Sequence, residues 1–128
     1  MYYKKNKAKW SSLRFNKFLA LCLVQDRYDY ACIACLKYYT KIKLSDCFKI
    51  DTLQVDEAVK TGILIIKNKF GIKYNIEISE SIKIGFIKML DETPAGEKIF
   101  IALNDKRKSA IKKFQDFVIQ QGGDFDVQ

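Results

Sequence analysis

Apolar residues recur at helical spacing along most of the chain, and polar residues that can cap a helix stand where such stretches begin. Ser11 or Ser12, Ser45 and Ser79 can each accept a hydrogen bond from the first turn of a helix. The predicted helices cover residues 12–25, 28–39, 46–50, 80–91 and 105–121.

The helix over residues 28–39 is apolar on nearly every side, and we therefore place it at the centre of the core. The longer helices around it carry one apolar face each. The side chains assigned to these faces are Leu13, Phe15, Phe18, Leu19, Leu21, Cys22, Val24, Ile82, Phe86, Ile87, Leu90, Ile111, Phe114, Phe117, Val118 and Ile119.

The hydrophobic period changes between residues 62 and 78. A β-branched run over residues 62–66 and a strictly alternating run over residues 72–78 predict two strands. The loop between them has Gly71 where a positive φ is expected, so the two strands form a hairpin. Residues 98–103 are either a short strand or an extended segment. We therefore predict an α+β fold: a mainly helical single domain with a β-hairpin, in a sheet of at most three strands.

Positive charge is concentrated at the start of the chain. The net charge is +8, and residues 1–17 hold six basic residues and no acidic one, so the remaining 17 basic and 15 acidic residues give only +2. We expect residues 1–10 to be a flexible basic arm and residues 11–128 to be the domain. Such an arm suits phosphate contacts to nucleic acid, although a solubilising tail has the same composition.

The four cysteines do not form a metal-site pattern. Cys32 and Cys35 lie in an apolar helical segment, and the chain has no histidine. We interpret all four as small buried hydrophobic residues with reduced thiols, and we expect neither a metal nor a cofactor. No apolar run reaches the roughly 18 residues that span a bilayer. A cytoplasmic or nucleoid-associated protein without a membrane partner is expected.

A turn with a cation follows the central helix, and its sequence resembles the first active-site motif of the tyrosine recombinase (phage integrase) family. That motif reads threonine, glycine, apolar, arginine, apolar, serine, glutamate, followed by a leucine and an aspartate. The residues in register with it are Thr40, Ile42, Leu44, Ser45 and Ile50. Lys43 replaces the arginine, Asp46 the glutamate and Gln54 the aspartate.

The resemblance continues through the hairpin. Lys69-Phe70-Gly71 stands where the family has an active-site lysine followed by threonine and glycine, and residues 76–79 match its apolar-x-apolar-serine pattern. Residues 122–124 resemble the approach to the histidine-x-x-arginine box. The resemblance covers residues 15–125 and implies the first half of a recombinase catalytic domain.

The groups that strand cleavage needs are missing from the chain. It has no histidine, no arginine after Lys69 except Arg107, and no tyrosine after Tyr74. Lysine at position 43 keeps the charge but loses the two-pronged grip of arginine on phosphate. Because removing one oxyanion contact commonly costs about 10²–10³ in rate, we expect no enzyme activity.

The resulting hypothesis is a non-catalytic protein that binds double-stranded DNA with little sequence preference, as an accessory or regulatory factor of a mobile element, virus or plasmid. The expected DNA-binding residues are Lys43, Lys67, Lys69, Lys4, Lys5, Lys7 and Lys9.

Three alternatives to this hypothesis stay open. Lys43 could instead be partly buried and paired with Asp46 or Asp51, and Lys69 could be an ordinary turn lysine. The basic residues of the last helix are interpreted as a solvated face. The alternative function is a protein-interaction module that binds itself or a full-length recombinase.

Overall fold

The computed structural model describes residues 11–40, 42–68 and 70–121. Its elements in chain order are α1 (Ser12–Val24), α2 (Tyr28–Tyr39), α3 (Leu44–Cys47), α4 (Thr52–Thr61), β1 (Ile63–Lys67), β2 (Lys73–Glu77), α5 (Glu80–Glu92) and α6 (Arg107–Gln120). This confirms a mainly helical α+β fold with an antiparallel hairpin. The predicted basic arm, with Lys4, Lys5, Lys7 and Lys9, lies outside the described residues, as do Lys69 and residues 122–124.

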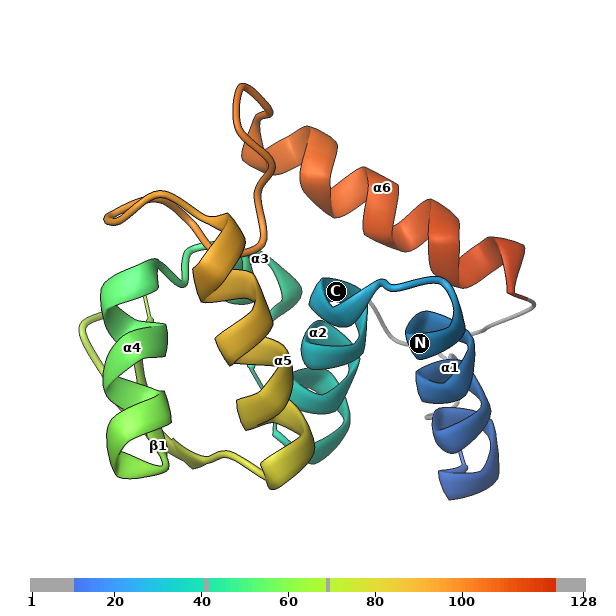
Figure 1. Ribbon diagram of the computed structural model, residues 1–128, viewed down its shortest axis with the longest axis horizontal. Coiled ribbons are helices and arrows are strands. Elements are labelled where there is room, and N and C mark those ends of the chain that lie inside the picture. Colours follow the sequence, from blue (N-terminus) through green and yellow to red (C-terminus); the bar gives the residue numbers. More distant parts are fainter. Residues whose placement is uncertain (1–10, 41, 69, 122–128) are drawn as a thin grey trace, which may run out of the picture.

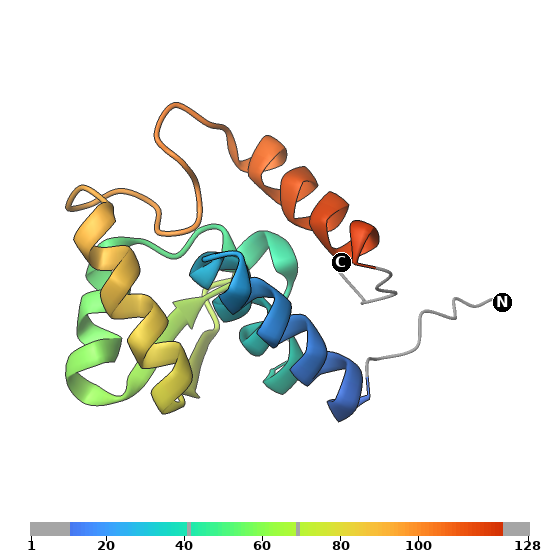
Figure 2. The same ribbon diagram turned by 45° about the vertical axis from the view of Figure 1, so that its right-hand side comes forward.

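Helix α2 lies at the centre of the molecule, with α1 on one side and α5 on the other (Figure 1). It buries a continuous apolar run over residues 32–36, as its sequence predicted. The close approach of α5 depends on Gly85, where an added Cβ would lie 2.7 Å from the Cys32 Sγ. Figures 1 and 2 show α6 crossing the molecule beside α1 and the start of α2. There the Phe114 ring packs edge-on against the Tyr30 ring, with the two centroids 5.2 Å apart. The Phe117 ring is tilted against the same Tyr30 ring, at a centroid distance of 5.0 Å.

The other side of the molecule consists of α4, the hairpin and α5. Helix α4 packs on both β1 and α5. It begins with a capping box in which the Asp51 carboxylate accepts from the Gln54 N–H and the Gln54 amide oxygen accepts from the Asp51 N–H, each at 3.0 Å. The amide nitrogen of Gln54 then donates to the Ile65 carbonyl at 2.9 Å, which joins the helix to β1.

Three predictions about the helices are wrong. Helix α4 was not predicted, although its sequence holds a capping box and the helically spaced Val55, Ala58 and Val59, because the segment is otherwise polar. Helix α3 begins at Leu44, so Ser45 lies inside it. Leu13, Leu21, Val24, Ile87 and Ile119 are exposed. On α6, for example, the buried face is Ala110, Phe114 and Val118, and no neighbouring helix covers Ile119.

Residues 98–103 form neither a third strand nor a regular element. The Ile99 N–H donates to the Ile50 carbonyl at 2.9 Å, and Lys98 makes one isolated bridge with Asp51. The preceding loop is held to α4 by Thr52, whose hydroxyl accepts from the Gly96 N–H at 2.6 Å. None of the helices described has the length and apolar character to cross a bilayer.

Candidate nucleic-acid interface

The outer face of the hairpin is basic toward its tip. The cross-strand pairs on this face are Ile63–Glu77, Ile65–Asn75 and Lys67–Lys73, and their side chains are exposed. On the opposite face, Leu64 and Ile66 are buried in the core. Lys67 and Lys73 are therefore directly opposite each other. Neither makes an ion pair with a carboxylate in the part of the chain that the structure describes.

The hairpin turn is held by Asn68 rather than by the exposed side chains around it. The Asn68 side-chain oxygen accepts from the Phe70 and Ile72 N–H groups at 2.9 and 3.0 Å. Gly71 has φ +80°, which confirms the predicted need for glycine. Phe70 is 75% exposed at the turn. The Asn68 side chain therefore shapes the turn.

Lys43 stands at the start of α3 with its side chain exposed. The predicted alternative of a partly buried lysine paired with an aspartate is wrong: Asp46 pairs with Lys49 at 3.3 Å, and Asp51 caps α4. The segment before Lys43 runs beside β2, because Thr40 and Ile42 line a groove together with residues 74–77. The turn with Lys43 and the hairpin are thus neighbours.

Two of the five basic residues at and within α6 are paired with aspartates. On α6, Lys112 pairs with Asp116 at 3.3 Å and Lys113 with Asp105 at 3.0 Å. The hydrogen bond from Lys113 lowers the pKa of the Asp105 carboxyl. Lys106, Arg107 and Lys108 are exposed at the start of the helix. This arrangement agrees with the interpretation of α6 as a solvated face.

All four cysteines are buried and free, which confirms their interpretation as small core residues. Burial raises the pKa of Cys22 and Cys47 to about 12 and that of Cys35 to about 11. At such values the thiolate nucleophile is not populated at neutral pH. No group of three or more potential metal ligands lies together in the described ranges.

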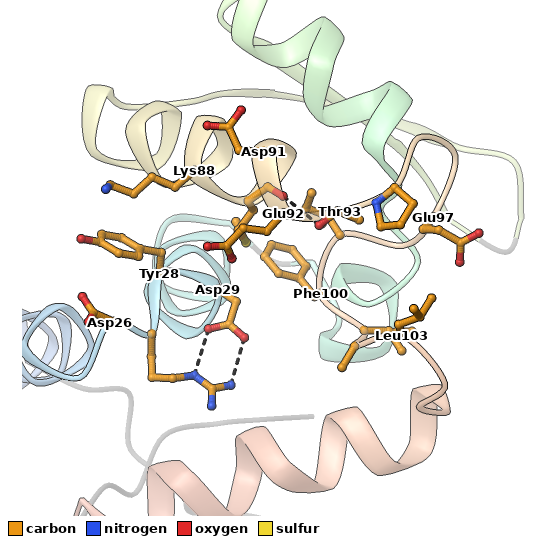
Figure 3. Close-up of a pocket in the computed structure, with 16 residues that line it drawn as sticks. Asp26, Tyr28, Asp29, Lys88, Asp91, Glu92, Thr93, Glu97, Phe100 and Leu103 are labelled. Atoms are coloured by element: carbon orange, nitrogen blue, oxygen red, sulfur yellow. Dashed lines mark hydrogen bonds and ion pairs between the residues drawn. The ribbon is translucent and has the colours of Figure 1, made fainter.

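A second concave region, the 26–29/93–103 cleft, was not predicted from the sequence. It has a volume of about 970 Å³ and lies between the α1–α2 turn, the end of α5 and the loop that follows (Figure 3). The carboxylates along it are Asp26, Asp29, Asp91, Glu92 and Glu97.

The cations of the 26–29/93–103 cleft already have partners. Arg27 pairs with Asp29 at 3.0 Å and stacks on the Tyr30 ring at 3.8 Å, while Lys88 lies 4.8 Å from the centre of the Tyr28 ring. The cleft contains none of the predicted DNA-binding lysines. Its acidic rim is unsuited to phosphate. The only sequence signal for it was the loop around Pro94.

Comparisons of the chain with protein-family models, with curated proteins and with solved structures find no match. The resemblance to tyrosine recombinases therefore remains a prediction from the residues quoted above. One departure from the family motif has a structural role in this chain. Gln54, which stands at the family's aspartate position, caps α4 and binds β1.

Proposed function

We propose that the chain is a non-catalytic protein that binds duplex DNA through phosphate contacts from its hairpin. The observation that carries the proposal is the exposed Lys67–Lys73 pair, two like charges at directly opposite positions of the ladder. Such a pair destabilises a hairpin on its own. A phosphate between the two ammonium groups would remove that repulsion.

The geometry of this pair favours an anion with oxygens on more than one side. Lys67 and Lys73 form a non-hydrogen-bonded pair, the type in which opposite Cα atoms approach to about 4.5 Å and side chains lie close together. Lysine ammonium groups are compact point charges that can share one phosphate without the fixed orientation that arginine imposes. This supports binding of the DNA backbone rather than catalysis on it.

The shape of the hairpin supports a duplex as the ligand. A two-stranded ribbon fits the major groove of B-DNA. Phe70 is exposed at the turn, and Lys43 lies on the neighbouring turn. Lys69 and the four lysines of the first ten residues would add sequence-independent attraction. The partner would be chromosomal, plasmid or viral DNA of the cytoplasm or nucleoid, with the chain acting as an accessory factor of a mobile element.

Salt-dependent DNA binding tests the proposal. We would titrate a labelled duplex of about 25 base pairs, following fluorescence anisotropy between about 50 and 200 mM salt. Lys67→Ala/Lys73→Ala should lower the affinity roughly 10- to 100-fold and reduce the slope of log K against log salt by about 2. The expected loss is uniform across DNA sequences.

The matched control is Lys60→Ala/Lys112→Ala. It removes the same formal charge from two exposed lysines that pair with Asp56 and Asp116. Its affinity should stay within about threefold of the unsubstituted protein. An affinity that is insensitive to salt, or an equal loss in both double variants, would contradict phosphate binding at the hairpin.

A further inference from the structure

Strand β2 has an open edge whose backbone groups point away from β1. The Ile78 N–H donates to the Gly62 carbonyl at 3.0 Å. Since hydrogen-bonded pairs alternate along an antiparallel ladder, Lys73, Asn75 and Glu77 direct their N–H and C=O groups outward. Within the described residues the sheet has only two strands. An open edge of this kind is a template for a further strand.

The outer face of β2 is complementary to itself. In an antiparallel pairing of two copies centred on Asn75, Lys73 of each copy lies opposite Glu77 of the other. These are the residues whose backbone groups point outward, so every one of the three positions is a hydrogen-bonded pair in this register. The central pair is amide against amide, and the flanking pairs join opposite charges.

The inner face of the same pairing is entirely apolar or aromatic. Tyr74 of each copy lies opposite Ile76 of the other, and Ile72 lies opposite Ile78. Tyr74 is 42% and Ile72 56% exposed in the single chain. Aromatic and β-branched residues at directly opposite positions are the pairs that stabilise a sheet.

No other register that keeps the hydrogen bonds has this complementarity. A shift by two positions places Lys73 or Glu77 opposite Asn75. A shift by four places Lys73 opposite Lys73, or Glu77 opposite Glu77, and like charges at opposite positions are destabilising. The charges of β2 thus select one register and one partner, a second copy of this chain.

We propose that two copies of the chain pair through β2 and form a continuous four-stranded sheet, in the order β1–β2–β2–β1. The groove of about 380 Å³ beside the edge, lined by Tyr39, Thr40, Ile42 and residues 74–77, leaves room for the inner-face side chains of the second copy. The contact is small, so the expected dissociation constant is roughly micromolar.

In the dimer the two hairpin tips lie at a defined distance from each other. The meaning of this distance for DNA binding rests on the proposed function. A two-fold axis perpendicular to the sheet keeps both outer faces on one side. Phe70 precedes Asn75 by five positions. At about 3.3 Å per residue the two tips would therefore be roughly 33 Å apart. One helical turn of DNA is about 34 Å, the usual spacing of half-sites bound by dimers.

Sedimentation of the full chain without DNA tests the dimer separately from DNA binding. The unsubstituted protein should pass from monomer to dimer as its concentration rises through the micromolar range. Asn75→Pro should lower the association constant more than 10-fold, because it removes an outward N–H that β1 does not use. Lys67→Glu, which lies on β1, should leave association unchanged while DNA binding is lost.

Charge reversal gives a test that does not change the backbone. Lys73→Glu and Glu77→Lys should each weaken association about 10-fold, by opposing like charges. The double variant Lys73→Glu/Glu77→Lys restores opposite charges and should recover association to within about threefold of the unsubstituted protein. Circular dichroism checks that each variant is folded.

Cross-linking locates the register. Asn75→Cys should form a disulfide-linked dimer on mild oxidation, because opposite Cα atoms in a hydrogen-bonded pair are about 5.5 Å apart. The native cysteines are buried and do not compete. Ser109→Cys, an exposed position on α6, is the control and should stay monomeric. A monomer at every concentration, or a dimer that Asn75→Pro and both single charge reversals leave unaffected, would overturn the proposal.

Discussion

The β-hairpin and the 26–29/93–103 cleft are two regions where charged side chains gather, and they differ in how those charges are used. In the cleft, Arg27 is hydrogen-bonded to Asp29 and Lys88 lies on an aromatic ring. At the hairpin, Lys67 and Lys73 face each other with no ion pair to a described carboxylate. The cations of the cleft are thus paired within one chain, while the Lys67–Lys73 pair needs an opposite charge from outside that chain.

This difference separates structural charge from charge available for binding. Volume alone would select the cleft, and the number of basic residues would select α6. On α6, however, two of the lysines are paired with aspartates. What distinguishes the hairpin is a repulsive pair at a defined position of the ladder, which costs stability and is explained by a ligand of opposite charge.

The largest expected effect is a loss of stability when a residue in the wall of the cleft is substituted. Phe100 is 5% exposed and packs against Phe48 and Phe86. Phe100→Ala should lower the free energy of unfolding by about 3–5 kcal/mol, since it leaves a cavity in the core. Urea denaturation followed by circular dichroism measures this. Leu103→Ala, a change at a 69% exposed residue of the same cleft, should change stability by less than about 0.5 kcal/mol. A loss in Phe100→Ala as small as this would mean that Phe100 is not a core residue.

The next effect concerns the attachment of the hairpin. Gln54→Ala removes half of the capping box and the hydrogen bond to the Ile65 carbonyl. We expect a loss of about 1–2 kcal/mol in the free energy of unfolding and faster hydrogen exchange along β1. Glu57→Ala, an exposed change on the same helix, serves as the control. Unchanged exchange in β1 would show that packing alone holds the hairpin on α4.

A third substitution separates stability from binding at the hairpin itself. Lys67→Glu replaces a repulsive cross-strand pair by an attractive one, so the protein should become more stable by about 0.2–1 kcal/mol. Its affinity for duplex DNA should nevertheless fall more than about 10-fold. Thermal unfolding and anisotropy on one preparation measure both quantities. A variant that loses stability would argue against repulsion between Lys67 and Lys73.

The smallest effect is expected from the carboxylates of the cleft. Asp91→Asn/Glu92→Gln makes the chain more positive by two charges without adding a phosphate contact. Its DNA affinity at about 150 mM salt should rise by less than about threefold, because exposed charges are screened over a Debye length of about 8 Å. An increase comparable in size to the loss in Lys67→Ala/Lys73→Ala would mean that net charge, and not the hairpin, governs binding.

Local patterns in the sequence predicted elements well where one physical signal dominated. The apolar run after Asp29 predicted α2 with its observed bounds, and the Ser79 cap predicted α5, where its hydroxyl accepts from the Ile82 N–H at 3.3 Å. The change to period two predicted the hairpin. Helix α4 was missed although Val55, Ala58 and Val59 recur at helical spacing, because these few apolar residues stand in a segment that is otherwise polar.

The candidate site was predicted only in part. Lys67 was identified as a tip residue, but Lys73 was not, because its importance depends on the register that places it opposite Lys67. The two backbone hydrogen bonds that the Asn68 side-chain oxygen accepts in the turn were not predicted. Such relations depend on which residues face each other across the ladder.

The sequence by itself determined the fold class, the central position of α2, the hairpin and the burial of the cysteines, because each follows from local periodicity and composition. Tertiary structure alone decided which cations face each other across the hairpin, which apolar residues stay exposed and which strand edge is open. Lys113 forms an ion pair with Asp105, eight positions earlier in the chain. Lys73 lies opposite Lys67 in the hairpin. Charge pairing depends on distance in space, and distance in space is fixed only when the helices and the hairpin have packed.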